Sequence, residues 1–81
     1  MNDRIRKILK DYGGMPVDVE TLADETDLFQ AGMTSHASLS VMLALEDAFD
    51  TEFPDNMLKR NIFSSVSSIS GALKELGVLV A

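Results

Sequence analysis

The chain has 81 residues, 46% of them hydrophobic, and a formal net charge of −6 at pH 7. This length predicts one small domain over residues 1–81 and leaves no room for a cleft between two domains. Because cysteine is absent, disulfides and thiolate metal sites are excluded, and the single histidine, His36, cannot form a zinc site alone. No apolar run approaches the ~18 residues of a membrane span, and the lack of cysteine fits a reducing compartment, so we expect a soluble, cytoplasmic protein. We also expect it to be a monomer.

The charge is distributed unevenly along the sequence. Residues 3–10 carry a net charge of +3, whereas the stretch from Asp11 to Leu58 contains eleven carboxylates and no lysine or arginine. Such a field repels nucleic-acid phosphates and anionic lipids and attracts basic protein surfaces. The charge pattern therefore predicts no nucleic-acid or membrane partner and favours a basic protein partner.

A first helix of about ten residues is predicted near the amino terminus and ends at Gly13 and Gly14. Four apolar residues there have the spacing of one helical face: Ile5, Ile8, Leu9 and Tyr12. Residues 13–34 follow as a long ordered loop, with one helical turn expected around Glu20–Asp24. A loop of this length in a small domain is typical of a functional segment.

The strongest predicted helix runs from Ser35, a favourable N-cap residue, to about Phe49. Its buried face is centred on Leu45 and also holds Ser38, Val41, Met42, Ala48 and Phe49. The opposite side holds His36, Ser40, Leu43 and Asp47, with Leu39 and Glu46 on the flanks. Leu43 is therefore expected to be exposed among acidic residues, as in many contact surfaces.

Two more helices are predicted toward the carboxyl end. Residues 53–55, Phe-Pro-Asp, indicate an extended entry with Asp55 as the cap of a short helix over 56–61. A last amphipathic helix follows the polar residues 64–68 and is closed by Gly77, before an apolar tail over 78–81 that packs or frays. The predicted fold is all-α, a small four-helix bundle with a long first loop.

The polar residues do not predict an enzyme. Adjacent side chains on a helix point about 100° apart, so His36 is badly placed to act as the base for Ser35. Neither acidic stretch matches a calcium loop, because residues 24–35 have Leu28 and Ala31 at ligand positions and residues 47–56 lack the central glycine. We expect no catalytic residue and no specific metal site, and a calcium sensor is the weakest interpretation.

The segment around Ser35 resembles an acyl carrier protein. That family has a leucine-bearing loop ending in Gly-x-Asp-Ser-Leu, a helix ending in Met-Ala-Leu-Glu-Glu-x-Phe, and then Ile-Pro-Asp with a short helix. The matching segments here are Asp27–His36, with Gly32 three residues before Ser35, then Met42–Phe49 and Glu52–Asp55. The resemblance covers nearly the whole chain in length and helix order and is specific over about residues 27–55.

The resemblance implies that a phosphopantetheinyl transferase esterifies Ser35 with 4′-phosphopantetheine from coenzyme A. Ser38 also precedes a leucine, but only Ser35 has glycine at −3 and the Leu-Glu-Asp-Ala-Phe block at the family's distance. The thiol of that arm would carry acyl or aminoacyl groups between partner enzymes as thioesters. The chain is therefore expected to be a stand-alone carrier protein and not an enzyme.

Two residues depart from the family pattern beside the modified serine. Thr34 replaces the family's Asp, and His36 replaces its Leu. Because partner enzymes read these neighbours, the departures argue against fatty-acid synthesis. Amino-acid loading by an adenylating ligase and polyketide-type or specialised lipid pathways are the alternatives.

The resemblance also implies a surface for the transferase, the loading ligase and the downstream acyl-using enzymes. The residues expected to contact these partners are Met33, Thr34, His36, Leu39, Ser40, Leu43, Glu46 and Asp47. Met33, Met42 and Met57 would form adaptable walls of any hollow between the helices. The competing interpretation is an unmodified acidic helical module that binds other proteins.

Overall fold

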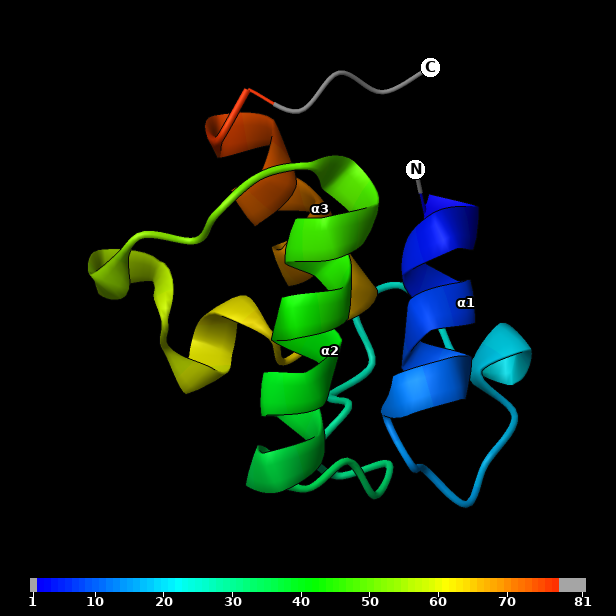
Figure 1. Ribbon diagram of the computed structural model, residues 1–81. Coiled ribbons are helices and arrows are strands. Elements are labelled where there is room, and N and C mark those ends of the chain that lie inside the picture. Colours follow the sequence, from blue (N-terminus) through cyan, green and yellow to red (C-terminus); the bar gives the residue numbers. More distant parts are fainter. Residues whose placement is uncertain (1, 78–81) are drawn as a thin grey trace.

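The computed structural model describes residues 2–77, so the apolar tail over 78–81 lies outside the described residues. Its three α-helices are α1 (Asn2–Tyr12), α2 (Ser35–Phe49) and α3 (Val66–Glu75). Three short 3₁₀ helices lie between them: η1 (Val19–Thr21), η2 (Asp55–Met57) and η3 (Arg60–Ile62). α1 runs antiparallel to α2 along one side, and α3 packs behind them (Figure 1). The prediction of an all-α fold is confirmed.

The core joins the apolar faces of the three helices with side chains from the segments between them. Leu45 of α2 is fully buried at its centre, as its helical spacing predicts, and Phe53 and Phe63 pack edge to face at 5.2 Å. Tyr12 was predicted to share one helical face with Ile5, Ile8 and Leu9, which are buried, but it is 52% exposed, because it lies at the rim of the groove between α1 and α2. No helix within residues 2–77 has the length and apolar character needed to cross a membrane.

The short helix predicted over residues 56–61 is wrong. The chain forms η2 and η3 there, and Asp55 is the first residue of η2 instead of its cap. Met57 and Phe63 are both buried, yet six residues on one α-helix would turn them about 120° apart. Two tight turns, separated by extended backbone at Lys59, bring both side chains into the core.

The first half of the long loop is held by Arg6 of α1. The Arg6 guanidinium donates to the carbonyl oxygens of Val19 and Leu22, each at 2.8 Å, and pairs with the carboxylate of Asp24. The Arg6 side chain is only 12% exposed. Backbone carbonyl groups that are partly buried need hydrogen-bond donors. By donating to two of them, the Arg6 side chain fixes the path of the loop past α1. The helical turn expected around Glu20–Asp24 is η1, which begins one residue earlier.

The second half of the loop is held by backbone hydrogen bonds to the start of α3. Leu28 N–H donates to the carbonyl of Ser64 at 2.7 Å, and Ser67 N–H donates to the carbonyl of Asp24 at 2.9 Å. Leu28 itself is fully buried. The loop is therefore an ordered part of the fold that delivers the chain to the start of α2.

Replacing Arg6 by methionine should destabilise the fold by about 2 kcal/mol, because the Leu22 carbonyl loses its donor, the Val19 carbonyl keeps only Leu22 N–H, and Asp24 loses its ion pair. Urea unfolding followed by far-UV circular dichroism measures this loss. The exposed neighbour provides a control, since Lys7→Met should change stability by less than about 0.5 kcal/mol. Equal losses for the two variants would contradict the role given to Arg6.

A second prediction concerns Gly32, whose φ of +117° lies where side chains rarely fit and whose added Cβ would lie 2.5 Å from Cδ of Pro16. Gly32→Ala should therefore cost about 2 kcal/mol or more in unfolding free energy. Gly71→Ala is the matched control, because nothing lies within 4 Å of its Cβ position on α3. That variant should be neutral or up to about 1 kcal/mol more stable. A harmless Gly32→Ala would refute the steric argument.

Candidate functional site

Ser35 is the first residue of α2, and its side chain is exposed. The predicted N-cap role of Ser35 is wrong, because Thr34 has the extended backbone of a cap and its hydroxyl oxygen accepts from Ala37 N–H at 3.0 Å. The Ser35 carbonyl accepts from the Ser38 hydroxyl at 2.6 Å, but the Ser35 hydroxyl makes no hydrogen bond within residues 2–77. A structural explanation of Ser35 as a helix cap therefore fails, and its hydroxyl is available for chemistry.

The loop immediately before Ser35 is firmly anchored. Met33 N–H donates to the carbonyl of Leu28 at 3.0 Å, and the Met33 side chain is 2% exposed in the core. Met33 was expected to contact partners, and the structure corrects this, because its side chain offers no surface. It instead holds the turn at Gly32 against the core and so fixes the position of Ser35.

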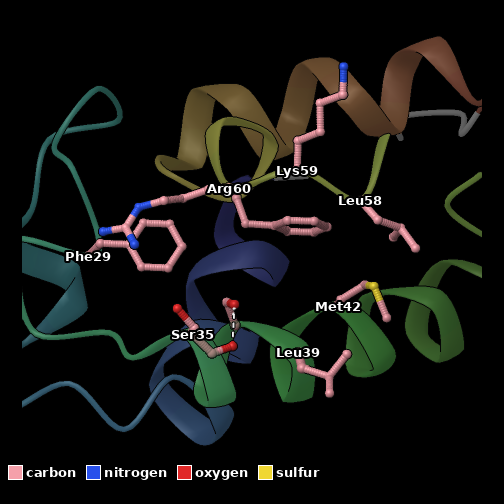
Figure 2. A pocket seen from close by; sticks show the side chains of 9 residues that line it. Phe29, Ser35, Leu39, Met42, Leu58, Lys59 and Arg60 are labelled. Carbon is pink, nitrogen blue, oxygen red and sulfur yellow. Dashed lines mark hydrogen bonds between the residues drawn. The ribbon is translucent and has the colours of Figure 1, made fainter. Parts of the chain in front are cut away.

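A pocket with a volume of about 300 Å³ opens beside Ser35 (Figure 2). Three parts of the chain line it, namely the long loop, one side of α2 and the segment from Leu58 to Phe63. Its lining residues are Phe29, Ser35, Ser38, Leu39, Met42, Leu58, Lys59, Arg60 and Phe63. Of the methionines expected as walls, Met42 lines the pocket, whereas Met33 and Met57 are buried in the core. A hollow thus exists next to the serine, mainly apolar in its lining.

Two basic residues stand on the side of this pocket opposite α2. The Arg60 guanidinium lies over the ring of Phe29, 4.1 Å from the ring centre. In Figure 2 this stacked pair faces the end of α2 that bears Ser35, whereas the Lys59 ammonium points away from it. Sequence reasoning missed both bases, although they directly follow the long stretch without lysine or arginine.

The outer face of α2 presents two large apolar side chains, Leu39 (51% exposed) and Leu43 (55% exposed). His36 and Asp47 are exposed on this helix, and Ser40 is half-buried. Leu43 therefore lies where its helical position predicts. Thr34 is exposed, but its hydroxyl oxygen is occupied by capping.

Glu46 differs from the other residues expected to contact partners. Its carboxylate accepts from Phe53 N–H at 2.8 Å, and its side chain is half-buried. This bond ties the segment after α2 back onto the helix. The Glu46 carboxylate is therefore used within the fold, and the Asp47 carboxylate is the more exposed of the two on this part of α2. Across residues 2–77, no three His, Asp or Glu side chains gather in a way that could hold a metal ion.

Known proteins share both the sequence pattern and the fold of this chain. A family model described as "Phosphopantetheine attachment site" matches residues 3–73. The aminoacyl carrier protein of Agrobacterium fabrum is 50% identical over 74 residues, which cover 91% of this chain and 89% of that protein.

Solved structures of carrier proteins also resemble this chain. A chain in the crystal structure of an engineered Bradyrhizobium japonicum glycine:[carrier protein] ligase, complexed with a carrier protein from Agrobacterium tumefaciens and AMP, superposes with a TM-score of 0.89. It is 50% identical, and the match covers 91% of this chain and 99% of that one.

A more distant structure shares the fold alone. It is a chain in the Bradyrhizobium japonicum glycine:[carrier protein] ligase complexed with glycylated carrier protein, with 21% identity, a TM-score of 0.75 and coverage of 88% and 95% of the two chains. The resemblance seen in the sequence is thus confirmed by the family model and by a closely similar relative over most of the chain. The protein belongs to the family defined by the phosphopantetheine attachment site, the family of the carrier proteins.

Proposed function

We propose that this protein is an aminoacyl carrier in which Ser35 bears 4′-phosphopantetheine and an adenylating ligase loads an amino acid onto it. The observation that carries this proposal is the Ser35 hydroxyl. It is exposed at the first position of α2, it is free of the capping bond that Thr34 makes, and it borders an apolar pocket. A serine with these properties can be esterified without any loss of helix stabilisation.

The residues around Ser35 fit a phosphate ester with an apolar extension. The amino-terminal end of α2 favours a negative group, because its first N–H groups lack helical partners and the helix dipole is positive there. Leu39, Met42 and Leu58 offer apolar surface beside the attachment point. When bound, the group supplies the thiol for thioester chemistry that a chain without cysteine lacks.

An amino acid is the cargo that the relatives support best. The Agrobacterium fabrum relative is an aminoacyl carrier protein, and the similar Agrobacterium tumefaciens chain was crystallised with a glycine:[carrier protein] ligase. The departures at Thr34 and His36, next to Ser35, agree with a loading enzyme other than that of fatty-acid synthesis.

Catalysis belongs to the partner enzymes in this proposal. Ser35 is the substrate of a transferase, and its hydroxyl has no hydrogen bond to a base within the described part of the chain. The role of the chain is to hold the hydroxyl at a fixed place and to present a recognisable surface around it. Its many carboxylates would steer basic partner surfaces toward α2, and the exposed Leu39 and Leu43 would supply apolar contact.

Incubation with coenzyme A and a broad-specificity phosphopantetheinyl transferase should add one phosphopantetheine group to the wild-type protein. Intact-mass spectrometry measures the addition. Ser35→Ala should abolish it because the acceptor hydroxyl is gone, whereas Ser38→Ala should retain it, since the Ser38 hydroxyl is bonded to the Ser35 carbonyl. If several transferases leave the wild type unmodified, the carrier function is wrong and the unmodified interaction module is favoured.

The surface of α2 generates a further prediction for the modified protein. Leu43→Ala and Asp47→Lys should each lower kcat/KM for aminoacylation by a glycine:[carrier protein] ligase about fivefold to tenfold, since each removes roughly 1 kcal/mol of contact or steering energy. Transfer of radiolabelled glycine to the holo protein measures this effect.

Val17→Ala is the control for these variants, because Val17 is an exposed apolar residue on the loop between α1 and η1. It should leave both the loading rate and the thermal unfolding unchanged. The rate for the wild type should also fall as salt rises, because steering between charged surfaces is screened. Loss of stability in parallel with loss of loading would show that Leu43 acts in the fold and not in docking.

A further inference from the structure

The charge around the pocket contrasts with that of the preceding chain. From Asp11 to Leu58 there is no lysine or arginine, and then Lys59 and Arg60 come together at the wall of the pocket that contains Ser35. A phosphate ester on Ser35 would add negative charge to an already acidic part of the molecule. The nearby bases are therefore placed where a counter-charge is needed.

The Arg60 guanidinium is positioned to bind an anion. Its guanidinium lies over the Phe29 ring, 4.1 Å from the ring centre, and this contact with the ring occupies none of its N–H donors with a hydrogen bond to an oxygen. Among the described residues it forms no ion pair with a carboxylate, although the protein has thirteen acidic residues. Stacking on the ring also restricts the motion of the side chain, so less conformational entropy is lost when an anion binds.

Resting on the function proposed above, we infer that Arg60, held by Phe29, pairs with the phosphodiester of the group on Ser35. This pairing would hold the pantoyl part of that group against the apolar wall of the pocket formed by Leu39, Met42 and Leu58. The protein would thus keep its own prosthetic group folded against α2 between encounters. A partner that binds the exposed face of α2 would have to compete with Arg60 for the phosphodiester.

The neighbouring base does not have the same role. Lys59 lines the same pocket and carries the same charge, but its ammonium points away from Ser35 (Figure 2). Lys59→Gln and Arg60→Gln remove equal charge from adjacent exposed positions. The pair of variants therefore separates a specific contact from a general change in the electrostatic field.

The test starts from isotope-labelled holo protein whose modification has been verified by intact mass. Nuclear Overhauser effects between the geminal methyl groups of the pantoyl unit and the methyl groups of Leu39 and Leu58 report contact with the pocket. At low salt they should be present in the wild type and in Lys59→Gln and absent in Arg60→Gln. The Arg60 side-chain N–H resonance should also shift when the apo protein is converted to the holo form.

Alkylation of the terminal thiol with iodoacetamide gives an independent readout, because this reagent is neutral. Arg60→Gln should be alkylated up to about fivefold faster than the wild type, the range expected for loss of one ion pair, and Lys59→Gln at the wild-type rate. Phe29→Leu retains the charge and an apolar wall but removes the ring beneath the guanidinium. It should give an intermediate rate, and it serves as the second test if Arg60→Gln lowers the thermal stability of the apo protein.

The outcomes separate this inference from the function on which it rests. If the wild type accepts no phosphopantetheine, both fall. If it is modified but the Overhauser effects and alkylation rates are the same in Arg60→Gln and Lys59→Gln, only the role of Arg60 is overturned. A change confined to the rate of loading by the ligase would show that Arg60 contacts the partner, and it would also overturn the inference.

Discussion

The position of Ser35 depends on hydrogen bonds that fix a long loop. Arg6 holds the carbonyl groups of Val19 and Leu22 at one end, and backbone bonds to the start of α3 hold Leu28 and Asp24 at the other. Without these bonds the loop between α1 and α2 would be held mainly by the buried side chains of Val19, Leu28 and Met33, and its backbone would gain conformational entropy. With them, the loop becomes part of the scaffold and brings α2 to a defined place.

At the start of α2 the adjacent residues Thr34 and Ser35 have different roles. The first N–H groups of a helix need acceptors outside the helix. The Thr34 hydroxyl oxygen accepts from Ala37 N–H, so the Ser35 hydroxyl is not needed for capping. The same separation occurs at the other end, where Glu46 binds Phe53 N–H while Asp47 faces solvent. In both places one polar residue maintains the fold and its neighbour remains free to meet a ligand or partner.

The electrostatic organisation follows the same division. The acidic residues are spread over the loop and the far end of α2, where they can act on a partner over a distance set by the salt concentration. The positive charge of Arg60 acts over a short range, because Phe29 positions the guanidinium beside the pocket of Ser35. In the proposed function, long-range attraction of partners and short-range positioning of the prosthetic group would be carried by residues of opposite sign on different segments.

The sequence by itself determined the all-α class, the approximate extent of the first two helices, and the central buried residue and exposed leucines of α2, because helical periodicity is a local property. Its short motif also predicted Ser35 as the attachment site. The tertiary structure decided what those patterns leave open: that Thr34 is the cap, that Met33 and Glu46 serve the fold, and that residues 55–62 form two 3₁₀ turns. It also placed Phe29 and Arg60, thirty-one residues apart, against one another beside Ser35. These features depend on which distant side chains compete for the same core volume and the same hydrogen-bond donors, and only the folded chain brings those competitors together.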